Sequence, residues 1–142
     1  MANTAGLLTA IAVLAAATFF GLWRRRTDGR IRAVAAADTD RLSAADLDTE
    51  LGTRATLVQF SSTICSACDA TRRILSAETA EGSGVVHVEI DAEQRLDLAR
   101  RYSVSRTPTV LILDAAGQIA HRASGAPRRT EVRAVLDALA AA

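Results

Sequence analysis

A stretch of 20 residues without a charged side chain, from Thr4 to Trp23, opens the sequence. About 20 mostly apolar residues are what an α-helix needs to cross the ~30 Å hydrocarbon core of a bilayer. Trp23 ends the stretch with an aromatic side chain suited to the membrane interface, and three arginines follow at 24–26. A cleaved signal peptide carries its positive charges before its apolar run, which is the reverse of this order. The sequence therefore predicts a transmembrane anchor over residues 1–26; a buried or interfacial helix is the alternative.

The distribution of arginine predicts how this anchor is oriented. Five arginines, at positions 24, 25, 26, 30 and 32, lie within ten residues of the C-terminal end of the span. On the other side, the α-amino group carries the positive charge. Because cytoplasmic flanks carry the excess of basic residues, we expect a single-pass protein with its N-terminus outside and its remaining residues in the cytoplasm. Residues 4–23 would then be the part that contacts the lipid bilayer.

The composition of the remaining chain excludes several classes of function. All 17 basic residues are arginine, so mechanisms that need a lysine amine, such as Schiff-base formation, are excluded. Residues 27–142 carry 14 Arg and 16 Asp or Glu, and their aromatic side chains are Phe60 and Tyr102. A nucleic-acid-binding surface needs a basic face with stacking aromatics, so we expect no nucleic-acid partner. No glycine-rich fingerprint follows a strand, so we expect no flavin or nicotinamide cofactor.

Residues 41–142 alternate between strand and helix patterns, after a predicted linker at 27–40 in which charged and small residues mix without a sustained period. Ser43 and Asp46 resemble a capping box, and short apolar runs are typical of buried strands. The expected order is helix 43–51, strand 56–60, helix 65–79, strand 85–90, helix 92–102, strand 109–113, strand 118–123 and helix 127–141. This order predicts an α/β domain in which helices cover both faces of one mixed sheet.

Both cysteines of the chain lie in one C-x-x-C motif, Cys65-Ser66-Ala67-Cys68, at the first turn of the helix after the first strand of the domain. Unpaired N–H groups and a partial positive charge at a helix N-terminus stabilise a thiolate. Cys65 is nearer to that end, so we expect it to have the lower pKa and to act as the nucleophile. Cys68, one turn later, is expected to resolve a mixed disulfide formed at Cys65.

A structural disulfide, a metal site and an inert pair are the alternatives for these cysteines. A disulfide across so short a loop removes little conformational entropy from the unfolded chain, which disfavours a purely structural role. Zinc would need two more ligands, and the spacings of the two imidazoles, His87 and His121, match no compact zinc module. We therefore expect a redox-active pair and no metal.

Several segments, taken together, resemble the thioredoxin family. The resemblance covers about residues 40–140 and implies a thioredoxin-like fold. The segments are the strand, C-x-x-C and helix start at 57–68, the cis-proline loop Arg106-Thr107-Pro108-Thr109, the hairpin turn at 114–118 and the small loop Ser124-Gly125.

The resemblance implies roles for four residues. Cys65 matches the attacking thiol and Cys68 the resolving thiol of a redox-active disulfide. Pro108 matches the cis-proline that faces the disulfide, and the backbone of Thr107 matches the segment that pairs with the substrate chain like an added strand. An ordinary turn before a strand is the alternative for Thr107 and Pro108. The resemblance implies a thiol–disulfide oxidoreductase that reduces partner-protein disulfides and receives electrons from a reductase or a dithiol donor.

The residues around the cysteines depart from the family pattern. Ile64 stands where thioredoxins have Trp, and Ser66-Ala67 replaces Gly-Pro between the cysteines. These changes leave the substrate range and the reduction potential undetermined. Asp69 follows the second cysteine, where the family usually has a basic residue; its charge opposes a nearby thiolate.

Two further positions concern proton transfer. Gln59 stands where thioredoxins bury an Asp that helps to deprotonate the resolving cysteine, and an amide cannot do this. His87 stands on the neighbouring strand in place of the family's partner Lys, so it is a candidate proton acceptor from Cys68. The alternative for His87 is a half-buried strand residue with a backbone partner. For His121 we expect an exposed side chain without a role.

Two other functions stay open at this stage. Membrane-anchored relatives work outside the cytoplasmic membrane as reductants or isomerases, and the arginine count is the argument against that location here. A thioredoxin-fold binding module with little turnover is the other alternative, because the missing Trp, Pro and buried Asp favour it.

Overall fold

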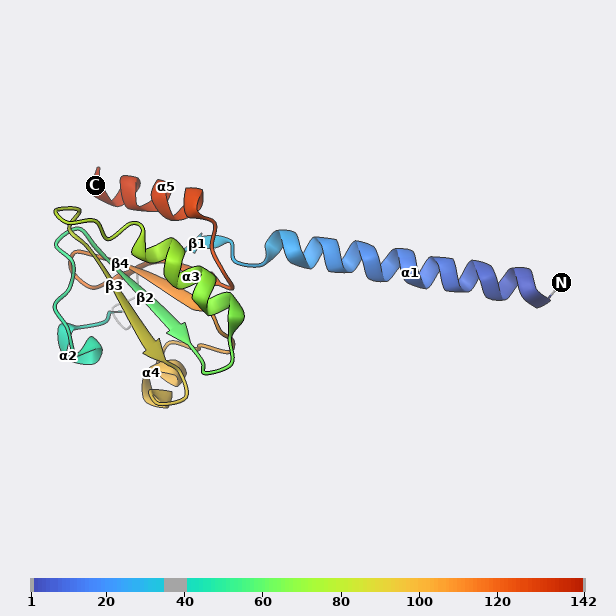
Figure 1. Cartoon of the computed structure of the whole chain (residues 1–142), viewed down its shortest axis with the longest axis horizontal. Coiled ribbons are helices and arrows are strands. Elements are labelled where there is room, and N and C mark those ends of the chain that lie inside the picture. The colour runs from blue at the N-terminus through green and yellow to red at the C-terminus, as the bar shows by residue number, and fades with distance from the viewer. Residues whose placement is uncertain (1, 35–40, 142) are drawn as a thin grey trace.

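The computed structural model describes residues 2–34 and 41–141, which form a long helix, α1 (Ala2–Thr27), and an α/β domain (Figure 1). The described part of the domain contains one sheet of five strands in the order β1-β5-β4-β2-β3. Strands β2 and β3 are parallel, and the other neighbours are antiparallel. The predicted mixed sheet is therefore confirmed. The strand bounds are β1 (Ile31–Ala33), β2 (Ala55–Ser61), β3 (Val85–Asp91), β4 (Thr109–Asp114) and β5 (Ile119–Ser124).

Helices cover both faces of the sheet, as the strand–helix order predicted. Helices α3 (Ser66–Ser76) and α5 (Arg129–Ala140) pack on one face, and α2 (Ala44–Leu47) and α4 (Leu96–Arg101) lie on the other. Successive side chains of a strand point to opposite faces, so β2 contributes to both cores. Leu57 packs with the α3 and α5 side, whereas Val58 and Phe60 pack with the α2 and α4 side. The same alternation places Gln59 on the face that α3 covers.

Helix α1 extends away from the domain (Figure 1). Its segment Gly6–Thr27 is long and apolar enough to cross a membrane, with a mean hydropathy of 2.0, and none of it is buried against the rest of the protein. By length and composition, a single helix of this kind near an N-terminus fits a membrane span or a signal sequence.

The segment expected to be a linker contributes a strand. Residues 31–33 form β1, which pairs antiparallel with β5 at the edge of the sheet. Ile31 is partly buried against the core between the sheet and α5, which explains why so short a strand stays on the edge. A run of three residues is too short for its period to be recognised in a sequence. Positions 35–40 of the expected linker lie outside the described residues.

The four helices of the domain are shorter than predicted, and the difference is largest in α2 and α4, where it has local reasons. The capping box of α2 is confirmed, because Ser43 and Asp46 exchange side-chain and backbone hydrogen bonds. The helix nevertheless ends at Leu47 rather than residue 51, since Asp48 adopts a left-handed conformation with φ 53°. Helix α4 begins at residue 96 rather than 92, after a turn in which the Asp91 carboxylate accepts a hydrogen bond from the backbone of Glu93.

Candidate redox site

Cys65 and Cys68 are joined by a disulfide at the start of α3, with Cα atoms 5.3 Å apart. Cys65 is the N-cap residue of the helix, and the backbone N–H of Cys68 donates to its Sγ at 3.2 Å. The two sulfurs differ in access, because Cys65 is partly exposed while Cys68 is only 2% exposed. Cys65 is therefore the member of the pair that a second protein can reach.

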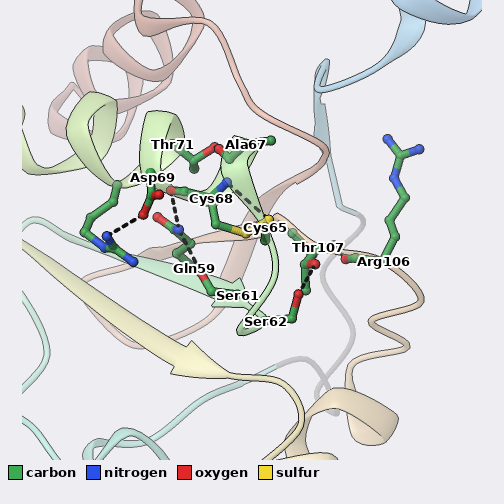
Figure 2. Close-up of a disulfide and its surroundings, with 12 residues drawn as sticks. Gln59, Ser61, Ser62, Cys65, Ala67, Cys68, Asp69, Thr71, Arg106 and Thr107 are labelled. Carbon is green, nitrogen blue, oxygen red and sulfur yellow. Dashed lines mark hydrogen bonds and ion pairs between the residues drawn. A yellow bond between two sulfur atoms is a disulfide. The ribbon is translucent and has the colours of Figure 1, made fainter.

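The peptide bond between Thr107 and Pro108 is cis, as predicted. This loop lies beside the segment that leads into α3, because the hydroxyl oxygens of Ser62 and Thr107 are 2.9 Å apart (Figure 2). The backbone N–H of Gly125 donates to the carbonyl of Pro108 at 2.7 Å and holds the loop from the other side. Within the described parts of the chain, no group is hydrogen-bonded to the backbone N–H or C=O of Thr107. That backbone is free to pair with another chain.

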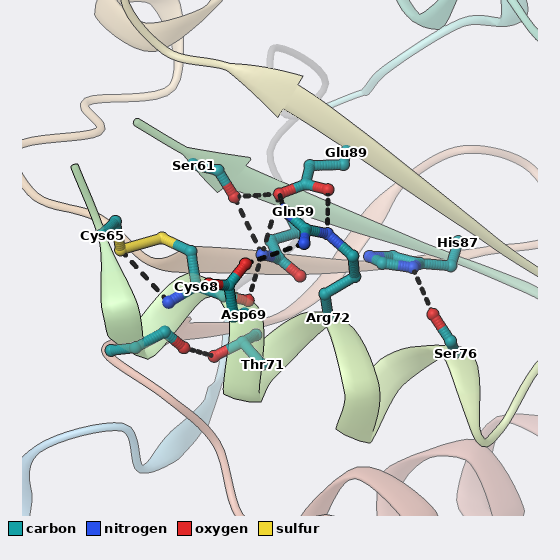
Figure 3. A network of polar contacts seen from close by, with 11 residues as sticks. Gln59, Ser61, Cys65, Cys68, Asp69, Thr71, Arg72, Ser76, His87 and Glu89 are labelled. Carbon is teal, nitrogen blue, oxygen red and sulfur yellow. Dashed lines mark hydrogen bonds and ion pairs between the residues drawn. A yellow bond between two sulfur atoms is a disulfide. The ribbon is translucent and has the colours of Figure 1, made fainter. Parts of the chain in front are cut away.

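Gln59 connects the first turn of α3 to the sheet below it. Its side-chain Nε2 donates to the carbonyl oxygen of Cys68 at 3.0 Å and to the hydroxyl of Ser61 at 2.8 Å. The Ser61 hydroxyl donates in turn to Oε1 of Glu89 at 2.6 Å. Gln59 is fully buried, so these bonds are made away from water. Figure 3 shows this chain of contacts running from the disulfide to β3.

Arg72 links the same network to the surface of α3. It forms a bidentate ion pair with Glu89, in which Nε is 2.5 Å from Oε2 and Nη2 is 2.8 Å from Oε1. Its Nη1 donates to Asp69 at 2.8 Å. The hydrogen bonds from Arg72, together with that from Ser61, hold the pKa of Glu89 below its usual range against the opposing effect of partial burial. Glu89 is therefore ionised near neutral pH. Arg72 also forms an ion pair with Asp69, which offsets the negative charge of that carboxylate beside the disulfide.

The structure does not bring His87 to the cysteines. Its Nδ1 is 3.4 Å from the hydroxyl of Ser76, the last residue of α3 (Figure 3). Ser76 follows Cys68 by eight residues, which is about 12 Å along a helix. Burial lowers the pKa of His87, with a smaller contribution from Arg72, and Glu89 opposes the shift. His121 is partly buried on β5, opposite Ile112, rather than exposed as expected.

The sequence analysis did not single out Glu89 or Arg72. The register of the parallel strands places Glu89 opposite Gln59. Arg72 follows Cys68 by four residues and so lies on the same face of α3. The helical spacing is visible in the sequence, but the register between β2 and β3 is not.

Two hollows flank the disulfide. One has a volume of about 600 Å³ and lies between the start of α3 and β3, with Ile64, Cys65 and Glu89 in its wall. The other has a volume of about 380 Å³ and lies on the cis-proline side, against Thr107 and Pro108. Ile64 is 96% exposed beside the disulfide, so an apolar side chain is available to a partner at this point.

A disulfide at a helix start, beside a cis-proline loop on a mixed sheet covered by helices, defines the thioredoxin-fold class of thiol–disulfide proteins. The family model described as the thioredoxin-like domain matches residues 48–140, so the chain belongs to the thioredoxin-like family. No curated protein matches the chain in a sequence search.

Solved structures of thioredoxins are similar to this chain. The thioredoxin NaTrxh from Nicotiana alata has a TM-score of 0.53 and 27% identity, over 61% of this chain and 73% of its own. The thioredoxin of Fasciola hepatica has a TM-score of 0.52 and 26% identity, over 61% of this chain and 81% of its own. The fold and the Cys65–Cys68 pair together support a thiol–disulfide oxidoreductase.

Proposed function

We propose that this protein is a membrane-tethered thiol–disulfide oxidoreductase that reduces the disulfides of partner proteins through Cys65 and Cys68. The observation that carries the proposal is the asymmetric pair at the start of α3: an accessible sulfur capped by a backbone N–H, and a buried sulfur one turn later. The cis-proline loop beside the pair supports it, because the free backbone of Thr107 offers a partner chain a place to bind.

The reaction begins with the pair reduced. The thiolate of Cys65, stabilised by the N–H groups of the first turn of α3, attacks one sulfur of the partner disulfide. A mixed disulfide forms, and the other partner sulfur leaves as a thiolate that takes up a proton. Cys68 then loses its proton and attacks the sulfur of Cys65. This step releases the second partner thiol and restores the Cys65–Cys68 disulfide.

Two electrons therefore pass from the pair to the partner in each cycle. A reductase or a dithiol donor must return them, since the chain's own chemistry at this site is limited to thiols. The partner chain lies along Thr107 as an added strand, so that backbone hydrogen bonds provide affinity and the nearby side chains provide selectivity.

Two single substitutions test the assignment of the thiols. Cys65→Ser and Cys68→Ser each remove the disulfide and leave one thiol, so each variant is the matched control of the other. We expect both variants to lose turnover in a disulfide-reduction assay with a small dithiol as electron donor. Only Cys68→Ser should accumulate mixed disulfides with partner proteins. Turnover that survives in Cys65→Ser would contradict the assignment, as would trapping by Cys65→Ser alone.

Labelling in intact cells tests the proposed membrane side. We propose that the domain lies in the cytoplasm, and the support is the group of arginines that follows the apolar stretch. Cells are treated with a membrane-permeant reductant and then with a membrane-impermeant maleimide, and a cysteine-free variant serves as control. The chain has two cysteines, both in the C-x-x-C, so labelling reports on the redox domain alone. Labelling only after lysis is expected; labelling of intact cells would instead indicate an exported reductant or isomerase.

A further inference from the structure

The connection between α1 and the sheet is short and is itself part of the fold. Helix α1 ends at Thr27 and β1 begins at Ile31, so three residues separate them. The backbone N–H of Gly29 donates to the carbonyl of Ser124 at 3.0 Å, immediately before β1 joins the sheet edge. The domain is thus joined to α1 without a flexible tether between them.

Close packing fixes this junction against the loops of the redox site. Gly29 is buried with φ +73°, and a Cβ at this position would overlap the carbonyl oxygen of Ala126. Gly125 has φ +102°, and a Cβ there would lie 3.0 Å from the backbone nitrogen of Gly29. Arg106, next to the cis-proline loop, binds both the carboxylate of Asp28 and the carbonyl of Ser124. Side chains larger than hydrogen would force the two segments apart.

The hollow on the cis-proline side is bounded partly by α1. Its wall contains Ala67 from the C-x-x-C, Thr107 and Pro108 from the cis-proline loop, and Arg25 and Asp28 from the end of α1. Figure 1 shows that α3 begins on the side of the domain from which α1 extends, and Figure 2 shows Arg106 between the disulfide and that helix. A chain that pairs with Thr107 must therefore pass beside the last turns of α1.

This arrangement sets the height of the site above a bilayer. Trp23 ends the uncharged stretch, and Arg25 in the wall of the hollow follows it by two residues, about 3 Å along a helix. Aromatic and basic residues at this boundary lie at the level of the lipid headgroups. If α1 spans the membrane, as the proposed function requires, the hollow faces the membrane surface.

We propose that the partner is a second membrane-bound protein whose disulfide lies in an extended segment directly beside its own transmembrane helix. The inference rests on the proposed function and specifies its substrate class. Such a segment enters the hollow at the level of Arg25, pairs with Thr107 and presents its disulfide to Cys65. The pair gives up two electrons, becoming a disulfide, and the partner disulfide takes up these electrons with two protons to become two thiols.

The test uses the full chain in lipid nanodiscs with three disulfide probes and a small dithiol as electron donor. Two probes are single-span polypeptides in the same nanodiscs: a near probe with its disulfide about four residues beyond the span, and a far probe with the same disulfide about 30 residues beyond it. The third probe is the same disulfide peptide free in solution. The encounter rate of tethered groups falls roughly as the −3/2 power of tether length, so we expect the intact chain to reduce the near probe at least about tenfold faster than the far probe.

A spacer variant separates this proposal from the proposed function. An insertion of about eight Gly and Ser residues between Thr27 and Asp28 leaves Asp28 and Gly29 attached to the domain. The inserted residues let the domain move about 16 Å away from α1. The matched control carries the same insertion between Glu81 and Gly82, in an exposed turn where Gly82 has open space around it. We expect the spacer variant to lose the preference for the near probe, the control to keep it, and all three proteins to reduce the soluble peptide at the same rate within about twofold.

Each other result is informative. A near-to-far ratio close to one in the intact chain, or a ratio that the spacer leaves unchanged, overturns the inference while reduction of the soluble peptide still upholds the proposed function. Failure of the intact chain to reduce any of the three probes overturns the proposed function, and the inference with it.

Discussion

Glu89 offers the sharpest test of how the site is held together. Its carboxylate accepts hydrogen bonds from Arg72 and Ser61, and the bond from Ser61 is 2.6 Å long. The substitution Glu89→Gln keeps the shape and one acceptor oxygen but removes the charge. A hydrogen bond to a charged group contributes about 1.5–3 kcal/mol, whereas an exposed ion pair contributes about 0.2–1 kcal/mol. The Arg72 side chain is 48% exposed, so solvent screening places the expected loss near neutral pH at about 1–2 kcal/mol.

The loss must depend on pH, because the hydrogen bonds from Arg72 and Ser61 lower the pKa of Glu89 in the folded protein. A carboxylate whose folded pKa is depressed stabilises the fold fully above its unfolded pKa of about 4.3 and loses that effect as the pH falls through the folded value. We therefore expect Glu89→Gln to be less stable than the parent near neutral pH. The two proteins should converge in stability below the folded pKa of Glu89.

Urea unfolding of the full chain in detergent, followed by far-ultraviolet circular dichroism, measures this difference. Glu93→Gln is the matched control, because Glu93 is an exposed carboxylate close to the same strand. In the double-mutant cycle with Arg72→Gln, we expect a favourable coupling energy near neutral pH that disappears below the folded pKa of Glu89. The reasoning is refuted if Glu89→Gln destabilises the protein equally at neutral pH and at pH 3, because packing rather than charge would then explain the loss.

Three further substitutions test the core, the junction and the histidine. Leu57 is fully buried, so Leu57→Ala should lower the free energy of unfolding by about 2–5 kcal/mol in urea titration, and a loss under about 1 kcal/mol would contradict its placement. Gly125→Ala should lower the free energy of unfolding by more than about 1 kcal/mol, and with it the thermal midpoint, because φ is +102° and Gly29 leaves little room for a Cβ. Gly82→Ala is the control: its φ is +78° but its surroundings are open, so it shows the effect of backbone conformation alone. His87→Leu should leave the pH dependence of disulfide reduction unchanged, since His87 contacts Ser76 rather than Cys68, and a changed pH profile in the variant would refute this.

Local sequence patterns were sufficient to predict the central elements. The apolar run at 56–60 became β2, with one residue added at each end, because a strand buried on both faces is mostly apolar. The position of the cysteines at a helix start also followed from a short motif. These features depend on neighbours along the chain, which the sequence displays directly. The cis bond before Pro108 was implied instead by the resemblance to the thioredoxin family.

Features that depend on contacts between distant segments were missed. β1 is a strand because β5 offers it an edge and Gly29 fits against Ala126, and neither partner is adjacent to it in the sequence. His87 lies half-buried on the strand beside β2, as expected, but its side chain lies beside the end of α3 rather than beside Cys68. Glu89 enters the site only because Gln59 faces it across two parallel strands, and that register is a property of the folded sheet.

In the proposed reaction, Gln59 and Glu89 limit how Cys68 can lose its proton. The amide of Gln59 contacts the carbonyl of Cys68 but cannot accept a proton. Glu89 is ionised, yet the hydrogen bonds from Arg72 and Ser61 that lower its pKa also make it a weak base. Neither group beneath the disulfide favours formation of the Cys68 thiolate, so the proton must pass to solvent or to a thiolate of the partner. Since Cys68 is 2% exposed, we expect this second step to be slow near neutral pH and to accelerate as the pH rises. In the proposed reaction, the mixed disulfide with Cys65 should then last longer at neutral pH than at higher pH.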